Sequence, residues 1–190
     1  SSVGQSWKKV EYTFMINSYS IMNILNTIRK IKPECKFFNA GSSEEYGLIK
    51  YTPQDINHPK TPQSPYATSK VLACNIIEFF RNTYNIFAIH SIMYNHEGPQ
   101  RDKKFVTRKI TSNIARIKKQ LEMDIIPEPL ELGNLNTKRD FGSSNDYVEA
   151  IWLMINNNIP KDYIVSTGKN NSLHDFISLS FKYSKIPIIW

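Results

Sequence analysis

The first part of the chain carries apolar residues three or four positions apart, a spacing that predicts an amphipathic helix. These residues are Ile21, Ile24, Leu25, Ile28 and Ile31. Pro33 would end the helix, because proline lacks the backbone N–H that a helix needs. The short apolar run at 36–40 then predicts a buried strand that leads into the polar turn Gly41-Ser42-Ser43.

A second helix should begin at Ser64 and Pro65, since serine is a favoured N-cap and proline a favoured first helical residue. We expect this helix to follow a proline-rich loop and to run to about Tyr84. The apolar run at 86–94 predicts a second buried strand. The first half of the chain therefore alternates between helix and strand.

The second half of the chain shows weaker patterns. Ser172 is a suitable N-cap for a helix, and the two prolines within 124–132 argue against a central strand there. The expected elements are a polar loop at 95–104, a helix at 105–121, a loop or edge strand at 124–132, a polar turn after Arg139-Asp140-Phe141, a helix at 146–156, a strand at 163–167, a helix at 172–183 and a strand at 186–190.

Helices that alternate with apolar strands indicate an α/β fold with a mostly parallel sheet. In such sheets, ligands bind beyond the carboxyl ends of the strands. The polar turns at 42–44 and 95–97 both follow predicted strands. We therefore expect the two turns to converge on one cleft.

Composition argues against several classes of protein. The 190 residues, 41% of them hydrophobic, suffice for one to one and a half domains. No apolar run approaches the ~20 residues that span a bilayer, and the first residues lack the pattern of a signal peptide. The net charge of +7 is scattered without a nucleic-acid-binding motif, so we assign most of it to solvated helix faces and a few charges to contacts with anionic ligands. Neither a membrane nor a nucleic acid is predicted as a partner.

The two cysteines, Cys35 and Cys74, lie far apart and outside the spacings of metal and redox motifs. We interpret them as small buried apolar side chains in a reducing cytoplasm. His58, His90 and His174 show no partner pattern and are interpreted as structural. The sequence thus predicts no metal site.

Tyr66 and Lys70 are four residues apart and therefore share one face of the second predicted helix. A cation within ~4–6 Å favours the phenolate form of a tyrosine, which can then act as a base near neutral pH. The spacing alone is weak evidence, because Tyr46 and Lys50 share it and ordinary surface pairs show it too. The combination with an upstream Ser42-Ser43-Glu44 turn at the end of a strand is much rarer by chance.

With these motifs the sequence resembles the extended short-chain dehydrogenase/reductases, and within them the GDP-mannose 4,6-dehydratases. The resemblance covers essentially the whole chain. It implies a partial Rossmann-type doubly wound parallel sheet with part of a smaller substrate-binding domain, and NADP as cofactor, with NAD not excluded. The segments that carry it are 39–47 (NAGSSEEYG), 64–70 (SPYATSK), 94–101 (YNHEGPQR), 105–110 (FVTRKI), 132–134 (LGN), 139–142 (RDFG) and 146–148 (DYV).

The resemblance implies a lyase that converts GDP-mannose to GDP-4-keto-6-deoxymannose. Tyr66, its pKa lowered by Lys70, would take the proton of the C4 hydroxyl as hydride leaves C4. Glu44 would take the C5 proton and protonate the departing C6 hydroxyl, before hydride returns to C6. Ser42 would hydrogen-bond the C4 oxygen, and Ser43 would position the sugar. Because Tyr and Lys alone only oxidise and reduce, Glu44 separates a dehydratase from an epimerase or a reductase.

The resemblance also implies four contacts with the GDP portion: Asn95, Arg101, Lys109 and Arg139. Arg139 could instead form a structural ion pair with Asp140 or Asp146. His96 and Arg108 match positions near the cofactor, Arg108 through a neighbouring subunit, and His96 could equally brace its loop.

Three further residues have expected places. Asn17 should lie at or just before the start of the first helix, where the superfamily often has a structural asparagine. Glu45 stands where the family is normally apolar, so we expect it at the rim of the cleft. Glu97 is expected to brace the loop that contains it.

A larger departure from the family is the missing Gly-rich turn: the chain has seven glycines and no G-x-x-G-x-x-G motif. We therefore assign 1–95 to the C-terminal part of an NADP-binding Rossmann domain. Residues 96–190 are assigned mainly to a nucleotide-sugar-binding domain, with about 133–157 returning to the Rossmann core. Without the turn that holds the pyrophosphate, the 190 residues alone should not turn over substrate.

Two alternatives stay open. The chain could act on another GDP-sugar, such as a GDP-heptose, or it could be a non-catalytic truncated remnant. The resemblance further implies a cytoplasmic homo-oligomer, either a dimer or a tetramer.

Overall fold

The computed structural model describes residues 2–189. The chain forms two compact units. The first unit contains the residues up to Tyr94 together with Asp146–Val165, and the second contains Asn95–Asn145 together with the residues from Ser166 onward. The predicted return to the first domain at about 133–157 is therefore displaced, because 133–145 lies in the second unit and the returning segment extends to 165.

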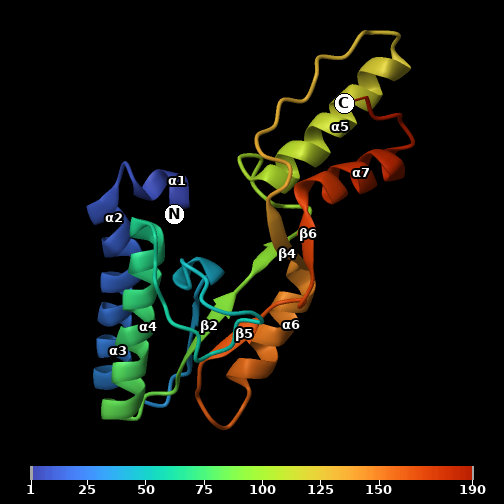
Figure 1. Cartoon of the computed structure of the whole chain (residues 1–190). Helices are drawn as coiled ribbons and strands as arrows, with labels where there is room; N and C mark the ends of the chain where they lie inside the picture. Colours follow the sequence, from blue (N-terminus) through green and yellow to red (C-terminus); the bar gives the residue numbers. More distant parts are fainter. Residues whose placement is uncertain (1, 190) are drawn as a thin grey trace. The chain divides into compact units, whose positions relative to one another are not determined.

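A parallel sheet of three strands lies at the centre of the first unit (Figure 1). Its order is β1 (Phe37–Ala40), β2 (Ala88–Met93) and β5 (Tyr163–Val165). Every residue of β2 is buried, which explains why its apolar run shows no alternation. The strands predicted at 36–40, 86–94 and 163–167 are thus confirmed.

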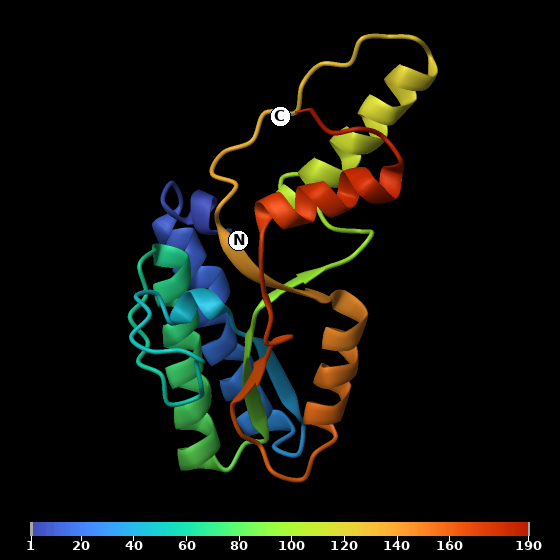
Figure 2. The ribbon, with the colours of Figure 1, turned by 45° about the vertical axis from the view of Figure 1, so that its right-hand side comes forward.

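Helices lie on both sides of this sheet in Figure 2, with α3 and α4 together on one side and α6 on the other. Helix α3 packs against α4 around a buried core made of Ile21, Leu25, Ala73, Ile77, Phe80, Ile86 and Ala88. The helical segments of this unit are α1 (Val3–Ser6), α2 (Val10–Phe14), the π-helix η1 (Met15–Tyr19), α3 (Ser20–Ile31), the 3-10 helix η2 (Ser43–Glu45), α4 (Pro65–Tyr84) and α6 (Ser144–Ile155), whose first two residues belong to the second unit.

Helix α4 begins and ends as its sequence predicts. The Ser64 hydroxyl accepts a hydrogen bond from the Ala67 amide, and Pro65 is the first helical residue. At the other end, Asn85 adopts a left-handed conformation with φ of 54°, a common way to end a helix. These two signals place Tyr66 in the first turn of the helix.

The second unit contains a smaller mixed sheet of β3 (Asn95–Glu97), β4 (Lys138–Ser143) and β6 (Asn170–Ser172), in the order β3-β4-β6. Strands β3 and β4 are parallel, and β4 and β6 are antiparallel. Helices α5 (Val106–Glu122) and α7 (Leu173–Ser184) pack against each other through Ile110, Ile114 and Ile177. Ser172 and Asp175 form the capping box at the start of α7.

Three predictions for the second unit and its ends were wrong. Residues 95–97, expected in a loop, form the strand β3. The polar turn expected after 139–141 is absent, because the strand β4 continues to Ser143 and α6 begins at the next residue. Both strands are polar, and their pairing in register (Asn95 opposite Phe141) overrides their weak strand propensity. Residues 186–189 form no strand; Ile186 and Ile188 pack against the core of the second unit instead.

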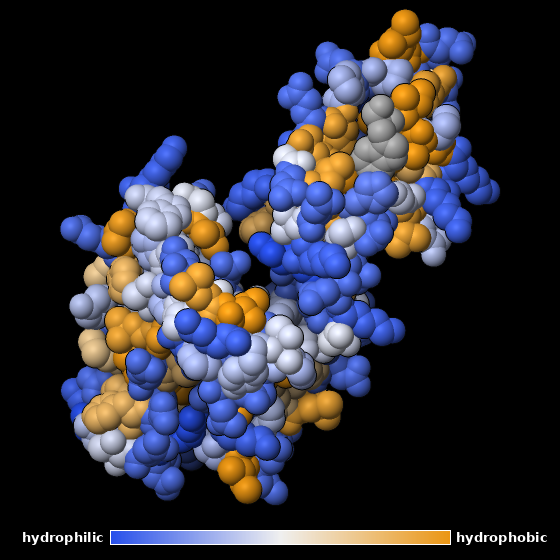
Figure 3. All heavy atoms as spheres, viewed as in Figure 1, coloured by the Kyte–Doolittle hydropathy of each residue, from blue (hydrophilic) through white to orange (hydrophobic). Residues whose placement is uncertain are grey.

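Part of the first unit's surface is apolar. Figure 3 shows hydrophobic surface over α3 and α4, and Met22, Ile24 and Phe79 are among its exposed side chains. Met22 and Phe79 line a groove between the two helices. No helix in the part of the chain that the structure describes is long and apolar enough to cross a membrane.

Candidate active site

The turn after β1 is held by its own side chains. The Ser42 hydroxyl accepts a hydrogen bond from the Glu44 amide at 3.3 Å, and the Ser42 amide donates to the Glu45 carboxylate at 2.8 Å. These two contacts form a capping box around η2. As a result, Glu44 is exposed beside the carboxyl end of a parallel strand, where α/β sheets bind their ligands.

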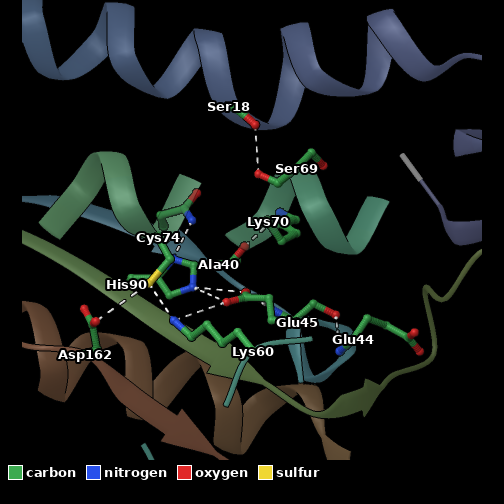
Figure 4. Close-up of polar contacts among 12 residues, drawn as sticks. Ser18, Ala40, Glu44, Glu45, Lys60, Ser69, Lys70, Cys74, His90 and Asp162 are labelled. Carbon is green, nitrogen blue, oxygen red and sulfur yellow. Dashed lines mark hydrogen bonds and ion pairs between the residues drawn. The ribbon is translucent and has the colours of Figure 1, made fainter. Parts of the chain in front are cut away.

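Tyr66 and Lys70 lie next to this turn in the same unit. The Lys70 ammonium donates a hydrogen bond to the carbonyl of Ala40, the last residue of β1, at 2.8 Å (Figure 4). The same nitrogen lies 5.7 Å from the centre of the Tyr66 ring. Burial lowers the pKa of Lys70, and the nearby Glu45 carboxylate counteracts part of this effect. Lys70 is thus anchored on the sheet, unlike a lysine of an ordinary surface pair.

Asn17 lies inside a continuous helical region, not at the start of a helix as predicted. Helix α2 already begins at Val10, and Asn17 belongs to the π-helical turn η1. Its side-chain amide donates to the Ser69 hydroxyl at 2.9 Å, and that hydroxyl donates to the Tyr66 carbonyl at 2.7 Å. Asn17 therefore braces the first turn of α4, consistent with the frequent occurrence of π-helical turns at functional sites.

The second Tyr-x-x-x-Lys pair is structural. Tyr46 is fully buried, and its hydroxyl donates to the Asp55 carbonyl at 3.0 Å. Burial, followed by the charges of neighbouring acidic groups, raises the pKa of Tyr46, which makes it a poor base. Lys50, by contrast, is exposed.

A buried polar cluster that the sequence did not predict lies beside the turn (Figure 4). We call it the Glu45 cluster; it contains Glu45, Lys60, Cys74 and His90. Glu45 and His90 have no solvent exposure, so the expectation that Glu45 lies at the cleft rim was wrong. The His90 Nε2 lies 3.0 Å from Glu45 Oε1, and the Lys60 ammonium lies 3.7 Å from Glu45 Oε2.

Cys74 takes part in this cluster and is more than a buried apolar side chain. The Lys60 ammonium donates to its sulfur at 2.8 Å, and the sulfur lies 3.8 Å from Asp162 Oδ2. Cys35, also predicted to be buried, is only partly so. Glu45, Cys74 and His90 bring three metal-ligand atoms within 4.8 Å of one another, and the Lys60 ammonium already supplies a cation to two of them.

The His90 side chain makes contacts on both ring nitrogens. Burial lowers the pKa of His90, but hydrogen bonds to Cys74 and Glu45 and the charge of Glu45 raise it to about 9. Asn39 lies 2.9 Å from the other ring nitrogen, Nδ1. The Asn39 atom at this distance is the amide nitrogen, which donates to Nδ1 of a neutral imidazole. An imidazolium donates from both ring nitrogens and would require the amide oxygen of Asn39 at this place.

We expect the stability of the protein to fall as pH rises through about 9. The folded state holds the proton of His90 more tightly than the unfolded state, in which the pKa is near 6.5. The contribution is therefore complete below about 6.5 and lost as pH rises through the folded-state value. It is on the order of 3 kcal/mol. Urea unfolding of the wild type and of His90→Gln between pH 6 and 10 measures this contribution. If the free energy of unfolding changes with pH by the same amount in both proteins, the raised pKa of His90 is contradicted.

The residues predicted to contact the nucleotide lie in the second unit. Asn95 opens β3, where it pairs with Phe141, and His96 follows it. Arg101 forms an ion pair with Glu97 at 3.3 Å, and its guanidinium lies 3.8 Å from the centre of the Phe105 ring. Glu97 also accepts a hydrogen bond from Thr107 at 2.6 Å. The position of Glu97 fits the bracing role expected of it.

Helix α5 places Arg108 and Lys109 in its first turns. Arg108 is partly buried, whereas Lys109 is exposed and donates to the Glu131 carbonyl at 2.9 Å. Lys109 also lines a polar depression together with Arg116 and residues 128–131.

Arg139 lies on β4 with an exposed side chain. Among the ion pairs of residues 2–189, none joins Arg139 to Asp140 or Asp146. Asp140 instead accepts hydrogen bonds from Thr167 and Gly168. The structural alternative for Arg139 is therefore unsupported.

The sequence-predicted residues fall into two sets. Ser42, Ser43, Glu44, Tyr66 and Lys70 are brought to the carboxyl end of β1 in the first unit. The second set, which lies in the second unit, contains Asn95, His96, Arg101, Arg108, Lys109 and Arg139. The expected convergence of the two turns on one cleft stays a prediction.

The sequence is similar to several known proteins of one family. The GDP-mannose 4,6 dehydratase of Drosophila melanogaster is 39% identical over 193 residues, which cover 100% of this chain and 47% of that protein. The GDP-mannose 4,6 dehydratase of Cricetulus griseus is also 39% identical over 193 residues, covering 100% of this chain and 50% of that protein. The chain thus spans about half the length of these curated relatives.

A solved structure shows the same fold. The structure of RMD from Pseudomonas aeruginosa complexed with NADPH matches with a TM-score of 0.90 and 22% identity, covering 99% of this chain and 64% of that one. The family model described as GDP-mannose 4,6 dehydratase matches residues 1–190. On this match and these relatives, the chain belongs to the GDP-mannose 4,6-dehydratase family.

Proposed function

We propose that this chain is the acid–base part of a GDP-mannose 4,6-dehydratase, which forms GDP-4-keto-6-deoxymannose. The observation that carries the proposal is the exposed Glu44 on a capped turn at the carboxyl end of β1. This turn contacts α4, the helix that bears Tyr66 and Lys70. A carboxylate and a phenol in one place supply both kinds of proton transfer that the reaction needs.

The proposed residues have separate tasks in this reaction. Tyr66 removes the proton of the C4 hydroxyl, and the Lys70 ammonium favours the phenolate by its charge. The 4-ketone that results makes the C5 proton acidic. Glu44 takes this proton and gives it to the departing C6 hydroxyl, so that water leaves with no net gain or loss of protons. When hydride then adds to C6, C5 takes up a proton, which is balanced by the one that Tyr66 removed from the C4 hydroxyl. Ser42 hydrogen-bonds the C4 oxygen, and Ser43 positions the sugar.

The residues at this place fit a nicotinamide dinucleotide. An ammonium has three donors, and the Ala40 carbonyl takes one of those of Lys70. The remaining donors of Lys70 and the hydroxyl of Tyr66 suit the diol of a ribose. NADP, when bound, supplies the hydride acceptor for C4 and the hydride donor for C6. The similar Pseudomonas structure holds NADPH, which favours NADP, and NAD is not excluded. His96 and Arg108 are proposed as further cofactor contacts.

Four residues of the second unit are proposed to bind the GDP portion: Asn95, Arg101, Lys109 and Arg139. Two of them, Lys109 and Arg139, present exposed cations suited to phosphate oxygens. Arg101 is already engaged by Glu97 and Phe105, so it is held in a fixed geometry.

Arg139→Gln should raise the KM for GDP-mannose with little change in kcat. The loss of a charge-assisted hydrogen bond costs about 1.5–3 kcal/mol, which corresponds to roughly 10–100-fold. Lys138→Gln is the matched control, because successive residues of a strand point to opposite faces. Steady-state kinetics of the full-length gene product measures both; equal effects of the two substitutions would remove Arg139 from the binding site.

The function is tested by incubating the full-length gene product with GDP-mannose and NADP and assaying the 4-keto product. A GDP-heptose is assayed in parallel, and a higher kcat/KM for it would favour the other GDP-sugar reading. Failure with both substrates would favour the non-catalytic remnant. The 190 residues assayed alone should be inactive, because they include no G-x-x-G-x-x-G turn for the pyrophosphate.

Two further properties stay predictions. The apolar surface of α3 and α4 supports a homo-oligomer, a dimer or a tetramer. The cytoplasmic location follows from the resemblance alone.

A further inference from the structure

The capped turn that bears Glu44 is tied to the protein interior through its neighbour Glu45. The Glu45 carboxylate accepts the Ser42 amide at 2.8 Å and lies 3.0–3.1 Å from His90 Nε2. It has no solvent exposure, and a buried carboxylate is costly unless it is paired and hydrogen-bonded. His90 of β2 and Lys60 of the proline-rich loop supply these partners. The turn is thereby connected to two other segments of the first unit.

This burial also decides where Glu44 points. In a 3-10 helix there are three residues per turn, so adjacent side chains are about 120° apart. With Glu45 directed inward on η2, Glu44 is directed outward, and it is exposed. The direction of the elimination carboxylate therefore depends on the anchoring of the next residue.

Glu45 and His90 also pack closely against the backbone at Gly41. A Cβ at Gly41 would lie 2.5 Å from His90 Nε2 and 2.6 Å from Glu45 Oε1, so the backbone here touches the carboxylate–imidazole pair directly. Gly41 immediately precedes Ser42 on the chain. Glu45 and His90 thus lie against Gly41, and Glu45 also accepts the hydrogen bond from the Ser42 amide.

We propose that Glu45 is a positioning residue of this enzyme: its buried carboxylate, held by His90 and Lys60, fixes the turn that carries Ser42 and Glu44. The proposal rests on the proposed dehydratase function. Glu45 touches neither substrate nor cofactor in this role; it acts through the Ser42 amide and through the direction of Glu44.

Two substitutions at Glu45 separate its hydrogen bond from its charge. Glu45→Gln keeps an oxygen that can accept the Ser42 amide, whereas Glu45→Leu has a comparable volume and no acceptor. Glu45→Met is a more flexible apolar replacement should the leucine variant not fold. Ile77→Val is the control, because it removes one methylene from the core between α3 and α4, away from the turn.

The full-length gene product is assayed for dehydration of GDP-mannose, for thermal unfolding and for amide hydrogen exchange in the peptide that contains Ser42. We expect Glu45→Leu to lower kcat about 100-fold with KM nearly unchanged, since small displacements of catalytic groups cost this much. Exchange in the Ser42 peptide should become faster. Glu45→Gln should recover most of kcat, and Ile77→Val should keep kcat despite a lower Tm.

Several outcomes would overturn the proposal. Wild-type kcat or unchanged exchange in Glu45→Leu would do so, as would an equal loss of kcat in Glu45→Gln and Glu45→Leu. Stoichiometric zinc in the purified protein that is lost in Cys74→Ser would also overturn it, because a metal and not Lys60 would then hold Glu45. If the wild type does not act on GDP-mannose, the proposed function fails, and the exchange of the Ser42 peptide alone decides whether Glu45 holds the turn.

Discussion

Glu44→Gln is expected to abolish loss of water while leaving oxidation at C4 intact. The amide cannot take the C5 proton, so the reaction should stop at the 4-keto sugar that still bears its C6 hydroxyl. General acid–base groups typically contribute ~10²–10⁴-fold. In the proposed mechanism Glu44 acts twice, so we expect the upper end of this range. Because Tyr66 and Lys70 remain, NADPH should accumulate in an amount near that of the enzyme.

The measurement is the near-ultraviolet absorbance of NADPH after mixing, together with the amount of dehydrated product. Glu78→Gln is the control, since Glu78 is an exposed carboxylate on α4 of the same unit. Dehydration by Glu44→Gln at close to the wild-type rate would show that another group performs the elimination.

Tyr66→Phe should stop the reaction one step earlier. Without the phenol no group takes the C4 hydroxyl proton, so neither NADPH nor a keto sugar should form, and kcat should fall ~10³–10⁴-fold. Lys70 remains bound to the Ala40 carbonyl, so the local structure should be retained. The absence of NADPH distinguishes this variant from Glu44→Gln.

The chain supplies a matched control for this second experiment. Tyr46→Phe removes a phenol with the same Tyr-x-x-x-Lys spacing, whose hydroxyl donates to the Asp55 carbonyl. It should lower stability by about 1 kcal/mol and leave kcat unchanged. Equal effects of the two phenylalanine substitutions on kcat would mean that Tyr66 is not the base.

The elements of the first unit could be predicted because local signals agreed with the fold. Ser64 and Pro65 predict the start of a helix, and the apolar run at 86–94 predicts a buried strand. The structure has α4 and β2 at these positions. The strands of the second unit lacked such signals. Asn95–Glu97 and Lys138–Ser143 are polar and become strands through pairing with each other, a long-range effect that no local pattern reports.

The same difference between local and long-range signals separates the predicted site residues from the Glu45 cluster. Ser42, Glu44, Tyr66 and Lys70 lie in motifs with short spacing, so their proximity could be inferred from the chain. Glu45, Lys60, Cys74 and His90 come from η2, a loop, α4 and β2, and no fixed spacing connects them. The one available signal was a carboxylate at a normally apolar position, Glu45, and exposure rather than burial was inferred from it.

The first unit consists of two separate stretches of the chain, which affects its folding during synthesis. Strand β2 pairs with β1, which is already synthesised, but its other edge pairs with β5, which is separated from it by the residues 95–145 of the second unit. A ribosome therefore completes β2 well before its second neighbour exists. During that interval a strand that is apolar at Ala88, Ile89, Ile92 and Met93 has an open edge. An open edge of this kind is a surface that chaperones bind and from which aggregation begins.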